Sequence, residues 1–494
     1  MDMRKEWLEK AEKLKPTLYR QTIHPVSGIP ESPLAEGNSV VLDFGTHWVG
    51  HLTLKLGSVG SHPDAPAWLR FKFCENEREL NESAENYRGW ISKGWIQQEE
   101  VHVDVLPAVL SLPRRYAFRY VRIDVLALSS KYQLTIQEVF AETTTSMDES
   151  AVSAFAGTAE DTALDRAALR TLRSCMQDFF EDGPKRDRRL WIGDLRLQAL
   201  AHSAISGKSD LVKRCLYLFA GTARDDGRIA ACLFTEPEIE ADDTFMFDYS
   251  LFFIPTLLNY VEHTGDVETG RDLIDLALTQ LTLADCQFDV TTQVINDSDV
   301  LGWCFIDWNL NLNKQASAQA VWIYCAKAAV HLLSLLGMQS RSAAIEEQIA
   351  MRSEAALKHF YKSERHLFVS GAGRQVSWAS QVWFILAGVL EANEAALCLQ
   401  AADSCTDIER MVTPYMMHHY IEALVSVGQL DKAKEMMRGY WGGMIAQGAD
   451  TFWELFNPAD PDESPYGSPI VNSYCHAWSC TPLWFLRSRF VGRE

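Results

Sequence analysis

Between residues 38 and 145 the hydrophobic and polar positions follow strand-like patterns. VVLDFGTHWVGHLTLKLGSVG alternates in part and ends on glycine, and the runs WLRFKFCEN, EEVHVDVLP, YAFRYVRIDVLAL and YQLTIQEVFAETT follow it. Alternation with a period of two is typical of strands that bury one face, and turn residues separate several of these runs. Short strands at this spacing predict an antiparallel β-sandwich.

After a segment rich in Thr, Ser and acids at 143–153, the apolar positions follow helical periods. About twelve helical stretches are expected, at approximately 160–180, 190–206, 209–224, 246–264, 266–285, 314–337, 340–362, 375–390, 392–404, 414–428, 429–441 and 473–489. Twelve helices in about 330 residues fit six helical hairpins closed into a ring, an (α/α)6 barrel. An open α-solenoid would show a repeat of about 34–45 residues, which the sequence lacks.

The predicted fold is therefore multidomain, with an N-terminal antiparallel β-sandwich followed by an all-α (α/α)6 barrel. We expect residues 1–148 to form the sandwich domain, with a short N-terminal helix, and residues 149–494 to form the barrel domain. Long loops with aromatic and acidic residues near 225–245, 286–312 and 442–472 are where function is expected.

The ends and the cysteines indicate a soluble, cytoplasmic protein. The start, MDMRKEWLEKAEKLKP, contains no apolar run of the signal-peptide type. The longest apolar stretches are interrupted by Pro255 in one case and by Lys327 and His331 in the other, and neither reaches the ~18 residues of a membrane span. The 11 cysteines are scattered without a CxxC pair, so we expect buried thiols rather than a disulfide framework or a zinc site.

The charge balance argues against two classes of partner. The chain has 46 Lys+Arg against 66 Asp+Glu, a formal net charge of −20, which opposes binding to nucleic acid and to anionic membranes. The 15 Trp, 15 Tyr and 23 Phe would supply flat surfaces for sugar rings, or simply a large aromatic core. Composition alone does not separate these two readings, and it favours the core.

The most informative segment for chemistry runs from residue 179 to 194. Three carboxylates, Asp182, Asp187 and Asp194, alternate with four basic residues and Trp191. Gly183 and Pro184 predict a turn at the end of a helix. Such a loop could be a solvated connection held by its own ion pairs, or it could present acids to a substrate.

A second candidate is Glu454, which lies inside the aromatic run GADTFWELF. Desolvation there would raise the pKa of its carboxyl and suit acid–base work, whereas pairing with an arginine is the structural alternative. Further candidates lie in loops and near helix starts: Asp248, Trp303, Asp307, Trp308, Trp453 and His476. A lone histidine is more often a core or capping residue than a catalyst.

No metal or other cofactor is expected. His418 and His419 are adjacent and would point apart on a helix, and the sequence contains no HExxH motif. Acids together with tryptophans in several loops of one helical barrel match glycoside chemistry instead. One carboxyl group protonates the leaving oxygen, and a second activates water or attacks the carbon.

At these residues the sequence resembles the α-L-rhamnosidases of glycoside hydrolase family 78. DGPKRDRRLWIGD resembles the family hallmark, and FDYSLFFIPTLLNYVEHTGD, CFIDWN, GADTFWELF and NSYCHAW are similar to later motifs in the same order. LDFGTHWVGHLTLKL and YAFRYVRID resemble the family's sandwich motifs. The resemblance spans about residues 40–490 and implies β-sandwich domains before an (α/α)6 catalytic barrel.

The resemblance also implies roles for individual residues. Asp187 takes the position of the general acid, and Glu454 that of the general base in an inverting mechanism. The remaining matches and near neighbours are expected in the rhamnose pocket, namely Asp182, Arg186, Trp191, Asp194, Asp248, Trp303, Asp307, Trp308, Trp453 and His476. The expected substrate is a small rhamnose-containing glycoside, because the chain has room for one sandwich and the barrel but not for additional carbohydrate-binding modules.

The sequence departs from the family pattern in the hallmark. Gly183 stands where the family has cysteine, one residue is missing, and the acid is Asp187 where glutamate is usual. Two alternatives therefore remain. One is another barrel hydrolase, such as an unsaturated uronyl hydrolase, in which arginines of this loop would bind a substrate carboxylate. The other is a catalytically weak sugar-binding relative. The sequence says little about the oligomeric state; the chain could form a homodimer, since symmetric dimers are the commonest oligomers.

Overall fold

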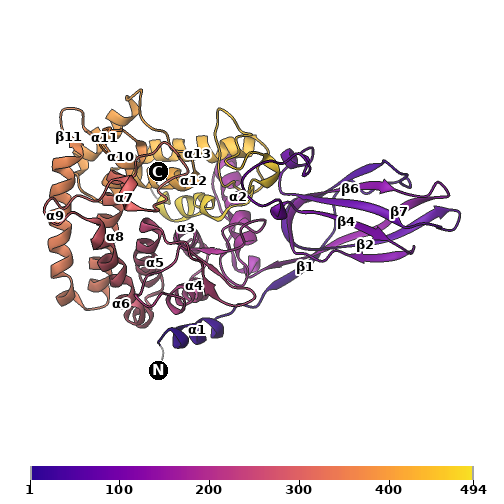
Figure 1. Ribbon diagram of the computed structural model, residues 1–494, viewed down its shortest axis with the longest axis horizontal. Helices are drawn as coiled ribbons and strands as arrows, with labels where there is room; N and C mark the ends of the chain where they lie inside the picture. Colours follow the sequence, from indigo (N-terminus) through magenta and orange to yellow (C-terminus); the bar gives the residue numbers. More distant parts are fainter. Residues whose placement is uncertain (1–2, 492–494) are drawn as a thin grey trace.

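The structure, a computed structural model, describes residues 3–491, so the outermost residues of the two expected domains, 1–2 and 492–494, lie outside the described residues. A body of strands occupies one end of the long axis and a body of helices the other (Figure 1). The strands come from the first third of the chain, and the helices follow from residue 159 onward.

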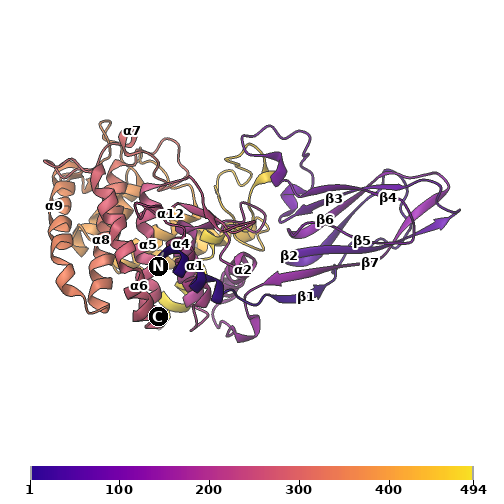
Figure 2. The same ribbon diagram turned by 60° about the horizontal axis from the view of Figure 1, so that its bottom comes forward.

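The strands form one antiparallel sheet that folds into two layers. They are β1 (Tyr19–Ile23), β2 (Ser39–Gly60), β3 (Ala67–Cys74), β4 (Gln98–Val103), β5 (Ala108–Ser111), β6 (Tyr116–Ala127) and β7 (Tyr132–Thr145), in the order β1-β7-β2-β6-β3-β4 with β5 beside β2. The first half of β2 pairs with β6, and its second half pairs with β7 and β5. Figure 2 shows β3, β6 and β4 above β2, β5 and β7.

One hydrophobic core fills the space between these layers. Leu52 and Leu54 of β2, Phe71 of β3 and Val121 of β6 are fully buried within it. Their alternation with exposed or half-buried neighbours produces the period of two that predicted strands. The predicted antiparallel β-domain is confirmed.

Twelve of the helices form a double ring. They are α2 (Ala159–Cys175), α3 (Ile192–Ser203), α4 (Asp210–Gly221), α5 (Phe247–Thr264), α6 (Val267–Ala284), α8 (Gln315–Leu335), α9 (Ala343–His359), α10 (Trp378–Leu386), α11 (Ala392–Asp403), α12 (Pro414–Ser426), α13 (Leu430–Ala446) and α14 (Pro482–Trp484). In the inner ring α3, α5, α8, α10 and α12 follow one another, and the short 3₁₀ helix η7 (Ala477–Ser479) with α14 closes the ring onto α3. The other helices flank this ring, which confirms the (α/α)6 architecture.

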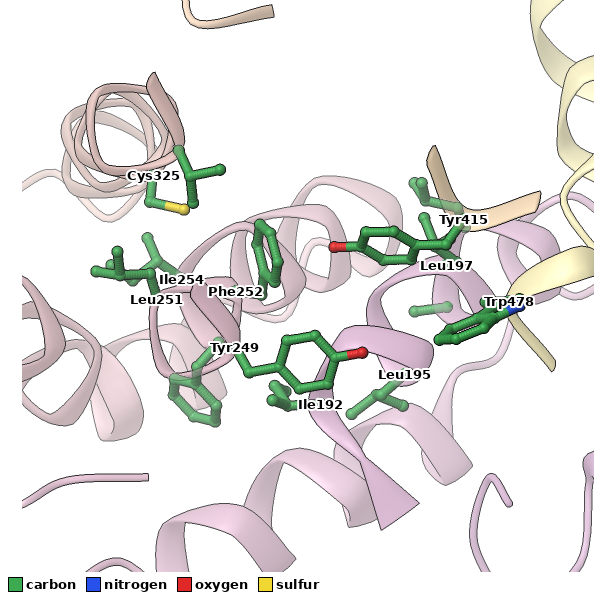
Figure 3. Packing of buried hydrophobic residues seen from close by; sticks show 14 of the residues in the cluster. Ile192, Leu195, Leu197, Tyr249, Leu251, Phe252, Ile254, Cys325, Tyr415 and Trp478 are labelled. Atoms are coloured by element: carbon green, nitrogen blue, oxygen red, sulfur yellow. The ribbon is translucent and has the colours of Figure 1, made fainter. Parts of the chain in front are cut away.

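Aromatic side chains fill the centre of the inner ring. Phe252 of α5, Tyr415 of α12 and Trp478 of η7 are buried there together with aliphatic residues of α3 (Figure 3). The ring of Trp478 stacks on Phe305 with 5.5 Å between ring centroids. Aromatic rings in mutual contact therefore pack the centre of the barrel.

The prediction of a last helix at 473–489 is largely wrong. Only η7, α14 and a five-residue π-helical turn, Phe485–Arg489, lie in that range. The preceding residues run extended, because Glu454 N–H donates to Ser473 O and His476 N–H donates to Phe452 O. Backbone pairing between two distant segments thus replaces the first helical turn.

The N-terminal helix α1 (Met3–Lys13) precedes the sheet domain in sequence but lies against α4 of the barrel. Trp7 and Ala11 are buried in this contact, and Lys10 Nζ donates to Asp272 Oδ2 at 2.6 Å. The helix expected to belong to the sandwich domain therefore packs on the helical domain. The chain then passes to the sheet, where β1 is the first strand.

The 11 cysteines are free thiols, and nine of them are buried, as expected from their scattered positions. Within residues 3–491, α8 is the one helix long and apolar enough to cross a membrane by length and composition, and 67% of its apolar window is buried inside the barrel. Its hydrophobicity is explained by its position in the inner ring.

Candidate active site

A cavity of about 470 Å³ lies among the barrel loops and the connection between β3 and β4, and its volume is within the usual range of small-ligand sites. It gathers loops that are far apart in sequence, from residue 90 to residue 478. Ten of the predicted site residues line it, namely Asp182, Arg186, Asp187, Trp191, Asp194, Trp303, Asp307, Trp308, Glu454 and His476.

The loop between α2 and α3 is folded around Asp182. Its carboxylate accepts the backbone N–H of Asp187 at 3.0 Å and that of Arg189 at 3.0 Å. A Cβ at Gly183 would lie 2.4 Å from Arg186 O, so the shortened loop closes in a way that only glycine fits. The Asp187 side chain, 27% exposed, is thereby held at the cavity wall.

The carboxyl of Asp182 has a strongly raised pKa and holds a proton at neutral pH. Burial is the largest cause, and the nearby negative charges of Asp187 and Asp194 add to it, so that the pKa of Asp182 rises to about 8. A protonated carboxyl donates a hydrogen bond as well as accepting one. Asp182 can therefore offer a donor to a hydroxyl oxygen of a bound sugar.

Asp194 and His476 form a buried ion pair on the opposite side of the loop. Their Oδ1 and Nε2 atoms are 3.1 Å apart, and both side chains are almost inaccessible. Burial opposes the charged imidazolium, but the contact with Asp194 and the charge of Glu454 outweigh it and raise the pKa of His476 to about 9. Burial raises the pKa of Asp194. His476 is thus a cation in the pocket rather than a neutral core histidine.

Glu454 is buried and tied at both carboxylate oxygens. Arg186 Nη2 donates to Oε2 at 2.5 Å, and the Tyr466 hydroxyl donates to Oε1 at 2.5 Å. Burial alone would raise its pKa, but Arg186, His476 and the Tyr466 hydrogen bond together lower it. Of the two alternatives that the sequence left open, a raised pKa or pairing with an arginine, the arginine pairing is the one found, and the pKa is lowered although the environment is aromatic. Glu454 is an anion at neutral pH, as a general base requires.

Asp307, which lines the cavity, also organises a loop. Its carboxylate accepts the N–H groups of Val412 and Thr413 at 2.8 and 3.1 Å and the Thr413 hydroxyl at 2.7 Å. Burial raises the pKa of Asp307 to about 6. Hydrogen bonds from the protein occupy most of the lone pairs of Asp307, so only the remaining lone pairs can accept a hydrogen bond from a substrate.

Two predicted pocket residues, Asp248 and Trp453, lie behind the cavity wall. Asp248 accepts the N–H groups of Phe305 and Ile306 at 2.9 and 2.8 Å and so fixes the loop that carries Asp307. Trp453 is buried beneath Arg78, whose guanidinium lies 5.2 Å from its ring. The motif led us to expect that both residues contact the substrate. Neither lines the cavity, and each instead supports a neighbouring residue of the cavity wall.

The cavity also contains residues that the sequence did not single out. They include five aromatic residues, Trp90, Tyr249, Phe305, Tyr466 and Trp478, and several that are not aromatic, among them Ile91, Met246, Asn309 and Lys314. Trp478 and Phe305 belong to motifs already noted, so their neighbours were a usable signal. Trp90 and Tyr466 are isolated in sequence, and only the folding of two loops onto each other brings them to the site.

Residues of the sheet domain also hold the loop between α2 and α3 in place. Arg115, which immediately precedes β6, donates to both oxygens of Glu181 at 2.8 and 2.9 Å, and Lys185 forms a buried ion pair with Glu79. Lys185 Nζ also donates to Asn472 O at 2.9 Å. The loop that carries Asp182 and Asp187 is therefore fixed by contacts with both domains.

Comparisons with known proteins agree with this arrangement. Residues 9–143 match the glycosyl hydrolase family 78 alpha-rhamnosidase N-terminal domain, and residues 158–489 match the bacterial alpha-L-rhamnosidase 6 hairpin glycosidase domain. A comparison with curated protein sequences gives no significant match.

Among solved structures, a rhamnosidase from Klebsiella oxytoca with rhamnose bound is similar over 99% of both chains, with 43% identity and a TM-score of 0.95. A family 78 rhamnosidase of Bacillus sp. GL1 aligns with 94% of this chain and 48% of its own, at 21% identity and a TM-score of 0.77. An α-L-rhamnosidase of Streptomyces avermitilis complexed with L-rhamnose aligns with 96% and 44%, at 14% identity and a TM-score of 0.69. The two longer structures show the same fold. The family models and the 43% identical relative establish that this chain belongs to the α-L-rhamnosidases of glycoside hydrolase family 78.

Proposed function

We propose that this chain hydrolyses terminal α-L-rhamnosyl residues from small glycosides with inversion, with Asp187 as general acid and Glu454 as general base. The observation that carries the proposal is that both carboxyls line one cavity with Arg186 between them. Its Nη1 lies 3.9 Å from Asp187 Oδ1, and its Nη2 lies 2.5 Å from Glu454 Oε2. Inversion needs carboxyls about 6.5–9.5 Å apart, with room for water, and a guanidinium between the two groups favours that larger separation.

The environments of the two groups suit different roles. Glu454 is kept anionic by Arg186, His476 and Tyr466, so it can accept a proton from a water molecule that attacks the anomeric carbon. Asp187 is partly accessible at the cavity wall, where it can reach the glycosidic oxygen and protonate it. Asp is one methylene shorter than the glutamate usual in this position, so either the backbone comes closer to the substrate or the activity is reduced.

The substrate assignment rests on relatives and on the lining of the cavity. The Klebsiella structure is described with rhamnose bound and the Streptomyces structure as complexed with L-rhamnose. Asp182 offers a hydrogen-bond donor to sugar hydroxyls and Asp194 an acceptor, while Trp191 and Trp308 offer flat surfaces for the ring. A volume of about 470 Å³ suits one sugar and a small leaving group.

The uronyl hydrolase alternative needs arginines ready for a substrate carboxylate. Arg186 is paired with Glu454, and Arg188 donates to Pro184 O and Arg115 O at 2.8 Å each. Arg189 lies 3.6 Å from Asp242. All three arginines of the loop are thus engaged, which favours a neutral sugar as substrate.

Two variants test the proposal against a sugar-binding protein without catalysis. Asp187→Asn and Glu454→Gln are each expected to reduce kcat on an aryl α-L-rhamnoside by at least about 100-fold, because general acid–base catalysis contributes roughly that much. Trp68→Phe, in the sheet domain outside the cavity, is the control and should behave as the unmodified protein. Near-normal turnover by both site variants would refute the roles, and rhamnose binding without any turnover by the unmodified protein would favour the binding alternative.

A further inference from the structure

Tyr466 contacts both members of the buried Arg186–Glu454 pair. Its hydroxyl donates to Glu454 Oε1 at 2.5 Å, and its ring lies 4.0 Å from the guanidinium carbon of Arg186. Arg186 is held further by a 2.7 Å hydrogen bond from Nε to Val471 O. Glu454 therefore has one orientation, with one oxygen held by the arginine and the other by the tyrosine.

Tyr466 belongs to an irregular segment, residues 457–472, that would not keep a side chain in place by itself. The segment contains a single 3₁₀ turn, Pro469–Val471, and its other residues are turns and bends. Burial of Tyr466 comes from a small hydrophobic cluster with Ile470 and Val471 on its own side and Tyr87 and Ile96 on the other. The last two residues come from the sheet domain.

The connection between β3 and β4 supplies this second side. Trp90 Nε1 donates to Pro465 O at 2.9 Å, and its ring centroid lies 5.4 Å from that of Tyr466. Gly89 approaches so closely that a Cβ there would lie 1.8 Å from Tyr466 O. The backbone of Tyr466 is thus in direct contact with the backbone of Gly89 in the sheet domain.

We propose that Tyr466 is a positioning residue for Glu454, and that the β3–β4 connection, through Gly89 and Trp90, holds Tyr466 in its working position. The inference rests on the proposed role of Glu454 as general base. It makes the sheet domain part of the catalytic machinery, because the orientation of the base depends on a contact across the domain interface.

The charged and titratable groups that face Glu454 are Arg186, His476, Asp194 and Tyr466. Tyr466→Phe removes one hydrogen bond to the carboxylate but keeps the ring beneath Arg186. Since that bond favours the charged carboxylate, its loss raises the pKa of Glu454, and the acid limb of the kcat/KM–pH profile moves to higher pH. We expect kcat to fall about tenfold or more, because a hydrogen bond to a charged group is lost, with KM little changed.

Gly89→Ala tests the contribution of the sheet domain without changing any residue that lines the cavity. Its methyl group must displace Tyr466, so kcat should fall and the acid limb should move in the same direction. Gly94→Ala in the same connection is the matched control, because its Cβ would meet only the Ser92 hydroxyl, at 3.3 Å. Trp90→Phe, which keeps a ring but removes the bond to Pro465, should give a smaller shift of the same sign.

The series includes Glu454→Gln, so that two failures can be told apart. An inactive Glu454→Gln together with a Tyr466→Phe variant of unchanged kcat and pH profile would overturn this inference and leave the proposed function intact. An active Glu454→Gln would overturn both. If Tyr466→Phe is impaired but Gly89→Ala matches Gly94→Ala, the part of the inference that concerns the sheet domain is refuted.

Discussion

Replacing His476 by asparagine removes the cation that neutralises the buried acids of the pocket. His476 contacts Asp194 at 3.1 Å and faces the carboxyl groups of Glu454 and Asp182. In the folded protein its pKa is raised from 6.5 to about 9, although burial acts in the opposite direction. The imidazole of His476 therefore binds its proton more tightly in the folded chain than in the unfolded chain.

The magnitude follows from this difference in pKa. Each pKa unit corresponds to about 1.4 kcal/mol, so protonation of His476 stabilises the folded protein by about 3 kcal/mol. Because the folded-state pKa is raised, this stabilisation is fully present below pH 6.5 and is lost as the pH rises to about 9. His476→Asn should thus be about 3 kcal/mol less stable than the unmodified protein at pH 6, and the gap should close towards pH 9.5.

The assay is urea unfolding followed by tryptophan fluorescence, with the two proteins compared at pH 6 and at pH 9.5. His331→Asn is the control, because His331 is exposed and lies 3.6 Å from Glu262 at the surface, where substitutions usually change stability by less than about 0.5 kcal/mol. A stability gap for His476→Asn that stays the same at both pH values would refute the assignment of His476 as a buried cation.

Two further substitutions test the packing around the site. Lys185→Met leaves Glu79 buried without its cation and should lower the unfolding free energy by about 3–5 kcal/mol at pH 8. Burial raises the pKa of Glu79 to about 7, so denaturation at pH 5, where Glu79 is protonated, should show a smaller loss, and an equal loss at both pH values would contradict the pairing. Gly193→Ala places a Cβ 2.4 Å from the Tyr249 ring, which should cost about 1–3 kcal/mol and raise KM as the ring is pushed into the cavity. Gly207→Ala, whose Cβ meets nothing within 4 Å, should do neither when thermal unfolding and kinetics are measured.

Local periodicity predicted most of the fold, because the inner and outer helices each bury a continuous apolar face. The expected stretch 314–337, for example, corresponds to α8 at Gln315–Leu335. Periodicity failed at 473–476, where residues pair by backbone hydrogen bonds with the segment around Glu454. Hydrophobic patterns record which side of an element is buried, but they do not record which distant segment supplies a hydrogen-bond partner.

The candidate site was predictable where chemistry and position coincide in one short motif. Asp182, Asp187 and Asp194 could be selected together because they lie in one short segment of the sequence. The functions of Asp248 and Trp453 could not be separated from those of pocket residues, since a motif shows that a residue is near a site but not which way it faces. Tyr466 gave no signal, because its contact with Glu454 depends on a loop of the other domain.

The central claim is that this family 78 enzyme inverts the anomeric configuration, and proton NMR of the first sugar released tests it most directly. During hydrolysis of an aryl α-L-rhamnoside, β-L-rhamnose should appear first and then equilibrate with the α anomer, because water attacks the face opposite the leaving group. Release of α-L-rhamnose as the first product would contradict the roles given to Asp187 and Glu454.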